Sequence, residues 1–294
     1  MKIGDPQRAT QHKRIRSTRS NSVFSQIYYV IQDYVRLIRP INCAMGALGT
    51  AIAVFISGGS SIYRYVIGAT IAFLVMAAGN ALNDYMDVEI DRIAHPDRPL
   101  PSGRMGTKSA LYFSIILFAL GLTISVPLGA LVVVIVSFNI AFMILYEVWG
   151  KRNPFGNVII SYLVGSLFLF GGAISGSIER VLVLFLLSFF ATFGREIAKG
   201  IEDLEGDRGK RRTMAVISPP AAKYLSVAFI AIAVALSPLP YAQGLFSEVY
   251  LILVAFADAV FLYSMISVLN GKRASALMRY GMILALVSFI GGTL

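Results

Sequence analysis

The feature that most constrains this chain is a succession of long apolar blocks. Nine follow one another along 294 residues, each about 17 to 25 residues long, the length a helix needs to cross roughly 30 Å of hydrocarbon. Stretches such as LGALVVVIVSFNIAFMILY do not alternate apolar and polar residues as membrane β-strands do. The blocks occupy residues 41–57, 62–83, 108–126, 130–149, 155–176, 181–198, 222–241, 245–269 and 276–294.

Composition supports a membrane location. Hydrophobic residues make up 56% of the chain and charged residues only 14%, whereas soluble domains are about one quarter charged. We therefore predict an all-α integral membrane protein with nine transmembrane helices. The single cysteine, Cys43, excludes an internal disulfide and a cysteine metal cluster.

The net charge of +10 is explained by topology. All but Arg64 and Arg180 of the 26 Lys and Arg residues fall in the first 40 residues or in the connections 84–108, 151–152, 195–223 and 271–279. Since cytoplasmic loops carry excess basic charge, we predict a cell-membrane protein with a cytoplasmic N-terminus and an external C-terminus. This distribution removes the reason to expect a nucleic-acid partner. Residues 1–22 are expected to form a disordered basic cytoplasmic arm without signal-peptide features.

Acidic residues gather in two connections, residues 80–92 and 195–208, which this topology places in the cytoplasm. DVEIDR at 87–92 and DLEGDR at 203–208 match at four of six positions with an offset of 116 residues. Four apolar blocks begin between the two motifs. We therefore predict one domain, 23–294, that could consist of two related halves, about 62–176 and 181–294.

The carboxylate spacing favours a divalent cation. On a helix, residues four apart share a face about 6 Å apart, so Asp87 and Asp91 would lie together with Asp84 one turn behind. Asp203 and Asp207 form the second pair. A helix C-terminus disfavours clustered negative charge, and oxygen ligands suit Mg²⁺. The alternative is a solvated membrane-edge face paired with Arg and Lys.

The two motifs are unequal, because Gly200 occupies the position equivalent to Asp84. Glu202 is expected to point away from Asp203 and to pair with a Lys or Arg. Basic side chains beside the acids could hold a diphosphate, since the arginine fork suits phosphate oxygens. The alternative is that each only anchors the chain at the cytoplasmic interface. The candidates are Arg92, Arg98, Arg104, Lys151, Arg195, Lys199 and Arg208.

These motifs resemble the UbiA superfamily of intramembrane prenyltransferases. Asn83-Asp84-x-x-Asp87-x-x-x-Asp91, preceded by Asn80, matches its NDxxDxxxD motif, and residues 203–207 match its DxxxD motif. The resemblance implies nine helices around a central cavity with a cytoplasmic cap. It also implies two Mg²⁺ ions that bridge the aspartates and a prenyl diphosphate, with both asparagines at the substrate. Tyr146 and Lys151 look like the family's Tyr/Lys pair.

Within the superfamily, the chain looks most like archaeal enzymes that transfer a geranylgeranyl group to geranylgeranylglyceryl phosphate. The segments that carry this likeness are REIAKGIEDLEGD, HPDRPLPSGR and SPLPY. The resemblance implies a phosphorylated glycerol-ether acceptor, for which Arg39 and Asn42 are candidates, with Arg36 in reserve. An aromatic acceptor, such as 4-hydroxybenzoate or a naphthoate, and divalent-cation transport are the alternatives. Asp258, inside an apolar block, is expected to have a structural role.

Overall fold

The computed structural model describes residues 23–207, 209 and 212–293, and every regular element in these ranges is a helix. The predicted arm 1–22, Arg208 and the side chain of Asp207 lie outside the described residues. The elements are α2 (Val23–Ile38), α3 (Pro40–Ile56), α4 (Ile62–Met86), α5 (Val88–Ala94), α6 (Thr107–Ser125), η1 (Val126–Leu128), α7 (Ala130–Val148), η2 (Gly150–Arg152), α8 (Gly156–Ser175), α9 (Ile178–Glu202), α10 (Leu204–Asp207), α11 (Met214–Ile217), α12 (Pro219–Leu236), α13 (Leu239–Ala242), α14 (Glu248–Leu269) and α15 (Ser275–Gly291).

Seven helices in the described ranges are long and apolar enough to cross a membrane: α4, α6 with η1, α7, α8, α9, α12 with α13, and α14. The pair α2 and α3 passes the same test together but bends by 50° at Arg39. Helix α15 is apolar and shorter, at 17 residues. The multi-pass helical class is thus confirmed. The count of nine spanning helices stays a prediction.

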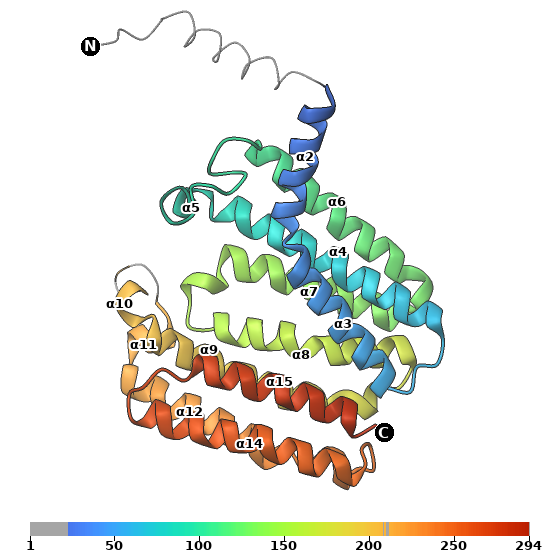
Figure 1. The fold of residues 1–294 in the computed structure, drawn as a ribbon, viewed down its shortest axis with the longest axis vertical. Coiled ribbons are helices and arrows are strands. Elements are labelled where there is room, and N and C mark those ends of the chain that lie inside the picture. The colour runs from blue at the N-terminus through green and yellow to red at the C-terminus, as the bar shows by residue number, and fades with distance from the viewer. Residues whose placement is uncertain (1–22, 208, 210–211, 294) are drawn as a thin grey trace, which may run out of the picture.

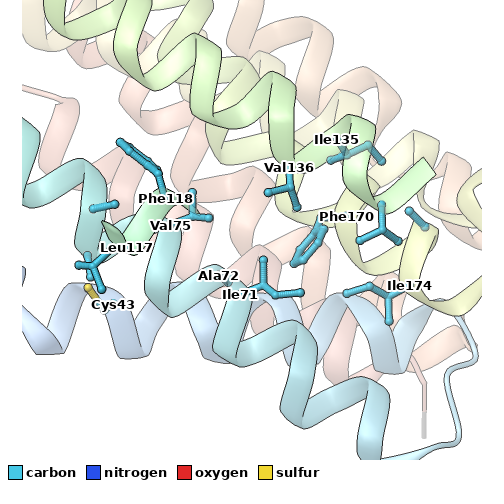
Figure 2. Close-up of a cluster of buried hydrophobic side chains, with 14 of the residues drawn as sticks. Cys43, Ile71, Ala72, Val75, Leu117, Phe118, Ile135, Val136, Phe170 and Ile174 are labelled. Atoms are coloured by element: carbon cyan, nitrogen blue, oxygen red, sulfur yellow. The ribbon is translucent and has the colours of Figure 1, made fainter. Parts of the chain in front are cut away.

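A buried apolar cluster joins the helices of the N-terminal half. Ile71 and Val75 on α4 meet Phe118 of α6, Val136 of α7 and Phe170 of α8 (Figure 2). Lipid tails are as apolar as these side chains, so close packing rather than exclusion from water holds such helices together.

Small residues bring the backbones close where α3 crosses α8. A Cβ atom added to Gly171 of α8 would lie 2.6 Å from the carbonyl carbon of Ala53 on α3. This distance is too short for any side chain. Glycine at position 171 is therefore required by the crossing itself.

Helices α4 and α9 carry the two aspartate motifs to the same end of the bundle. Figure 1 shows α5 and α10, which follow them, both at that end. Each motif helix is 25 residues long, and each ends at an aspartate cap, Asp87 with φ −96° and ψ 7°, and Asp203 with φ −92° and ψ 5°. Asp87 and Asp91 therefore flank an interruption rather than lie on one continuous helix. The N–H of Asp91 still donates to the Asp87 carbonyl at 2.8 Å, which preserves the four-residue spacing.

A similar buried serine contact occurs in each of two helix pairs, α4 with α6 and α9 with α12. The Oγ of Ser114 on α6 donates to the Ala78 carbonyl of α4 at 2.8 Å. The Oγ of Ser226 on α12 donates to the Gly194 carbonyl of α9 at 2.7 Å. Positions 78 and 194 are separated by the offset of the two motifs. The pair α4 and α6 is therefore held in the same way as the pair α9 and α12.

Candidate active site

Asp84 is the most enclosed carboxylate of the first motif, with 3% of the residue exposed. It lies in the last turn of α4, where Arg39 forms an ion pair and hydrogen bond with its Oδ1. A nitrogen of Arg98 lies 3.6 Å from the same oxygen and 2.5 Å from Oδ2 of Asp91. Two guanidinium groups thus hold two of the three motif aspartates from the side of α2 and of the 95–99 loop.

Asp87 is held from the opposite direction, by α7 and the turn after it. Lys151 Nζ lies 2.7 Å from Asp87 Oδ2 and 2.5 Å from Glu147 Oε2. The contact with Glu147 is an ion pair whose angles do not meet those of a hydrogen bond. The other oxygen of Glu147 accepts a bond from Asn83 Nδ2 at 3.1 Å. Since Asn83 also accepts from Arg39 at 3.3 Å, it joins the two sets of contacts.

These contacts form one continuous network of alternating charge at the end of α4. It contains four carboxylates and three basic groups, so it carries one excess negative charge. Asp203 of the second motif is exposed and has no hydrogen bond or ion pair among the described residues. The charged members are Asp84, Asp87, Asp91 and Glu147 with Arg39, Arg98 and Lys151, and the neutral Asn83 links the two sets.

A divalent cation fits this donor set in charge and in ligand type. Carboxylate oxygens are what Mg²⁺ prefers, usually one or two per ion with phosphate oxygens and water completing the shell. The described residues contain no three-ligand metal cluster. Arg39, Arg98 and Lys151 already contact oxygens of Asp84, Asp91 and Asp87, so an ion that bound these same oxygens would displace the basic groups.

Arg39 sits at the bend between α2 and α3 in an unusual backbone conformation. Its φ of 52° and ψ of 68° lie in the left-handed region, and it is the only non-glycine residue with positive φ in the described ranges. Such a conformation costs on the order of 1 kcal/mol for a non-glycine residue and persists where surrounding contacts fix it. Here the guanidinium contacts to Asn83 and Asp84 fix it. The bend therefore aims Arg39 at the first motif.

A polar pocket of about 430 Å³ lies between this bend and the loop after α5. The basic side chains Arg36, Arg39, His95 and Arg98 line it, with Asp84 and Asp97. Arg36, the reserve candidate for the acceptor, thus lies beside Arg39, and His95 adds to the candidates expected from sequence. Asn42 is exposed and does not line this pocket.

The second motif is organised differently. Glu202, the last residue of α9, accepts hydrogen bonds from the start of α15. It interacts electrostatically with Arg273, but it forms no direct ion pair with a Lys or Arg among the described residues. The carboxylate instead satisfies backbone N–H groups that a helix N-terminus leaves free. Arg195 pairs with its neighbour Glu196, and Lys199 is exposed.

The turn after α7 links the two motifs. The carbonyl of Arg152, next to Lys151, accepts a bond from the Arg212 N–H at 3.1 Å. Arg212 follows the second motif in sequence. The residue that contacts Asp87 is therefore adjacent in sequence to a residue that bonds Arg212.

Several other predicted residues lie outside the network. Asn80 donates to the Ile38 carbonyl at 2.8 Å and thereby fixes the end of α2. Arg92 pairs with Glu89 on the exposed face of α5. Arg104 binds Asp33 of α2 at 3.1 Å and the Asp97 carbonyl at 2.8 Å, which holds the 95–104 loop against α2.

Tyr146 lies on α7 next to Glu147 and packs beside Gly150, whose added Cβ would meet its ring at 3.0 Å. Asp258 lies away from both motifs, on α14. Its carboxylate accepts a 2.6 Å bond from Ser237, whose carbonyl accepts the Tyr250 hydroxyl at 2.5 Å. These contacts agree with the structural role expected for Asp258.

An apolar cavity of about 190 Å³ lies between α4, α7 and α8. Its lining includes Ala72, Met76, Val164 and Phe170, and its one polar side chain is Asn139. Met76 precedes Asn83 by seven residues on the same helix, so the cavity lies about 10 Å along α4 from the polar network. The site therefore combines a pocket lined by charged side chains with an apolar cavity.

Residues 45–289 match the model of the UbiA prenyltransferase family. The chain belongs to this family. It is 43% identical over 280 residues to digeranylgeranylglyceryl phosphate synthase of Methanococcoides burtonii, covering 89% of this chain and 100% of the relative. It is 39% identical to the Methanopyrus kandleri protein of the same name, with 90% of this chain and 100% of the relative covered.

Solved structures agree on the UbiA fold. A structure of digeranylgeranylglyceryl phosphate synthase superimposes with a TM-score of 0.83 at 37% identity, covering 89% of this chain and 98% of that one. A UbiA homologue from Archaeoglobus fulgidus, bound to GPP and Mg²⁺, gives a TM-score of 0.72 over 89% and 98% of the two chains. At 18% identity, the second comparison supports the fold alone.

Sequence reasoning missed Glu147, which joins Asn83 to Lys151. The signal was present, since an ionisable residue near the end of an apolar block is costly in a membrane and suggests a functional partner. Lys151 follows Glu147 by four residues, the spacing of a helical ion pair.

Proposed function

We propose that this chain catalyses Mg²⁺-dependent transfer of a geranylgeranyl group from geranylgeranyl diphosphate to geranylgeranylglyceryl phosphate. The product is digeranylgeranylglyceryl phosphate, an archaeal ether-lipid precursor. The supporting observation is the alternating network of carboxylates and basic groups at one end of a membrane bundle. The chain also matches relatives named for this synthesis over their whole length.

The aspartates of both motifs would hold two Mg²⁺ ions, with Asp84, Asp87 and Asp91 on one side and Asp203 and Asp207 on the other. When bound, such ions would supply positive charge for the diphosphate. The bond between the allylic carbon and the diphosphate oxygen would break, and the diphosphate would leave with the electron pair. The acceptor hydroxyl oxygen would then bond to that carbon and pass its proton to the released diphosphate or to water. Charged donors aimed at developing negative charge lower such barriers. We assign Lys151 the role of donor to the leaving diphosphate, and its 2.7 Å contact with Asp87 of the first motif supports this role.

The acceptor phosphate is assigned to the polar pocket beside Asp84. Four basic groups line it: Arg36, Arg39, His95 and Arg98. Guanidinium groups bind phosphate oxygens through two N–H donors at once. The pocket shares Arg39 and Arg98 with the metal motif, so the acceptor head group would lie next to the reacting bond. A 4-hydroxybenzoate carboxylate carries less charge for the same four groups to match.

The prenyl tail is assigned to the apolar cavity between α4, α7 and α8. No charged side chain lines this cavity, and Asn139 is its one polar side chain. The motif end is assigned to the cytoplasm and the C-terminus to the outside, on the distribution of basic residues. The chain forms one domain of two related halves. The paired aspartate caps and the paired serine contacts support this duplication.

The assignment is tested with purified protein, geranylgeranyl diphosphate and Mg²⁺. Geranylgeranylglyceryl phosphate and 4-hydroxybenzoate are supplied in separate reactions, and products are identified by mass spectrometry. Product with only the glycerol-phosphate acceptor supports the proposal. Product with only 4-hydroxybenzoate contradicts it. Mg²⁺ flux into proteoliposomes without prenyl transfer would indicate a transporter instead, although these carboxylates lie at helix ends rather than at mid-helix breaks.

A further inference from the structure

Glu202 closes a tertiary cap between two helices. Its Oε1 accepts the backbone N–H groups of Ala274 at 2.8 Å and Ser275 at 2.7 Å. Its Oε2 accepts the Ser275 hydroxyl at 2.7 Å. A carboxylate is favoured at a helix N-terminus because free N–H groups and the helix dipole both point at it. One side chain of α9 therefore satisfies three donors at the start of α15.

This cap lies directly beside the second aspartate motif. Glu202 is the last residue of α9, and Asp203 is its C-cap residue. Helix α15 also packs along α9. The cap therefore ties the turn that carries Asp203 to a second helix, while the Asp203 carboxylate itself contacts no described partner.

Among the described residues of the N-terminal part, from residue 23 onward, no equivalent of this cap is formed. The position that corresponds to Glu202 there is Met86, which is 40% exposed. In that half, direct contacts from Arg39, Arg98 and Lys151 hold the aspartates themselves. The two motifs are thus fixed by different means, the first through its carboxylates and the second through the backbone beside its carboxylate.

We propose that Glu202 is a positioning residue for the second metal-binding motif. By capping α15, it fixes the end of α9 so that Asp203 is presented to the cation held between the motifs. Glu202 itself binds no metal, because its two oxygens already accept three hydrogen bonds. The inference rests on the proposed function, since it assumes that both motifs share the cations of prenyl transfer.

Two measurements test the proposal on the full-length protein in detergent. Binding of Mn²⁺ alone is followed from the electron paramagnetic resonance signal of the free ion, and the Mg²⁺ concentration for half-maximal prenyl transfer is measured separately. Glu202→Ala should weaken Mn²⁺ binding about tenfold, equivalent to about 1.4 kcal/mol, and raise the Mg²⁺ requirement similarly. The rate at saturating Mg²⁺ should stay within about twofold of the unmodified protein, because no group at the reacting bond is removed.

Ser275→Ala removes one of the three donors and should give a smaller shift in the same direction. It also keeps the proposal testable if Glu202→Ala does not fold. The matched control is Glu248→Ala, which removes an exposed carboxylate in the first turn of α14. This control should leave both measurements unchanged.

Unchanged Mn²⁺ affinity and Mg²⁺ requirement in folded Glu202→Ala, or in Ser275→Ala alone, would overturn the positioning role. So would an equal loss of rate at every Mg²⁺ concentration, which indicates a purely structural cap. Failure of the proposed function looks different. There the unmodified protein itself would form no prenylated product, and the role of Glu202 would fall with it.

Discussion

Lys151→Met is the most informative single change in the network. The Lys151 ammonium lies 2.7 Å from an Asp87 oxygen and 2.5 Å from a Glu147 oxygen. The side chains of Lys151 and Glu147 are only 13% and 8% exposed, whereas that of Asp87 is 27% exposed. Replacing Lys151 by an uncharged side chain of similar length therefore leaves Glu147 as an enclosed carboxylate without its cation.

The expected loss of stability follows from this burial. Removing one partner of a buried ion pair typically costs about 3 to 5 kcal/mol, because the other charge remains desolvated. The Asp87 carboxylate is partly exposed to solvent, so the loss of its contact with Lys151 adds little to this cost. We expect Lys151→Met to lower the free energy of unfolding by about 3 kcal/mol. Adding Glu147→Gln removes the stranded charge and keeps an oxygen for Asn83, so it should restore about 2 kcal/mol of that loss.

Activity should follow a different pattern from stability. Loss of one charged donor to a developing anion lowers turnover by about 100-fold or more. Adding Glu147→Gln does not restore the positive charge that Lys151→Met removes. The double variant should therefore be stable and inactive. Thermal unfolding in detergent and product formation are measured on both single variants, the double variant and the unmodified protein. Lys108→Met, an exposed lysine at the start of α6, is the matched control.

Two results would refute this reasoning. If Lys151→Met unfolds at the same temperature as the unmodified protein, the ion pair is not the enclosed contact described above. If Glu147→Gln does not recover stability in the Lys151→Met background, the stranded carboxylate is not the cause of the loss.

Three further predictions concern the motifs, the packing and Asp258. Asp87→Ala and Asp203→Ala should each lower turnover at least about 100-fold with circular dichroism unchanged, and normal activity of both variants would contradict the shared metal site. Gly171→Ala should lower the unfolding temperature, because its Cβ would lie 2.6 Å from a backbone carbon. The control Gly49→Ala, on the same interface, should leave the unfolding temperature unchanged, because its Cβ would meet its nearest neighbour at 3.6 Å. Equal unfolding temperatures of the two variants would reject the close crossing. Asp258→Asn should keep most prenyl transfer and lower the unfolding temperature, and a large loss of turnover in the folded variant would assign it a direct role instead.

Much of the site could be predicted from sequence because its chemistry is local. The spacing of Asp84, Asp87 and Asp91 follows from one stretch of chain, and the matching DLEGDR segment indicated a second motif. The partners could not be predicted in this way. Arg39 meets Asp84 across 45 residues, and Glu202 meets Ser275 across 73, so only the packing of different helices decides these contacts.

The long apolar blocks by themselves determined that this protein is a helical membrane protein, because backbone N–H and C=O groups in hydrocarbon must be satisfied within each helix. Sequence also determined which residues carry negative charge at the ends of α4 and α9. Tertiary structure decided what surrounds that charge: Lys151 beside Asp87, the bend at Arg39, and the cap of Glu202 on α15. These features depend on which faces of distant helices meet, and apolar helices in a membrane meet through shape, which a hydrophobic pattern does not encode.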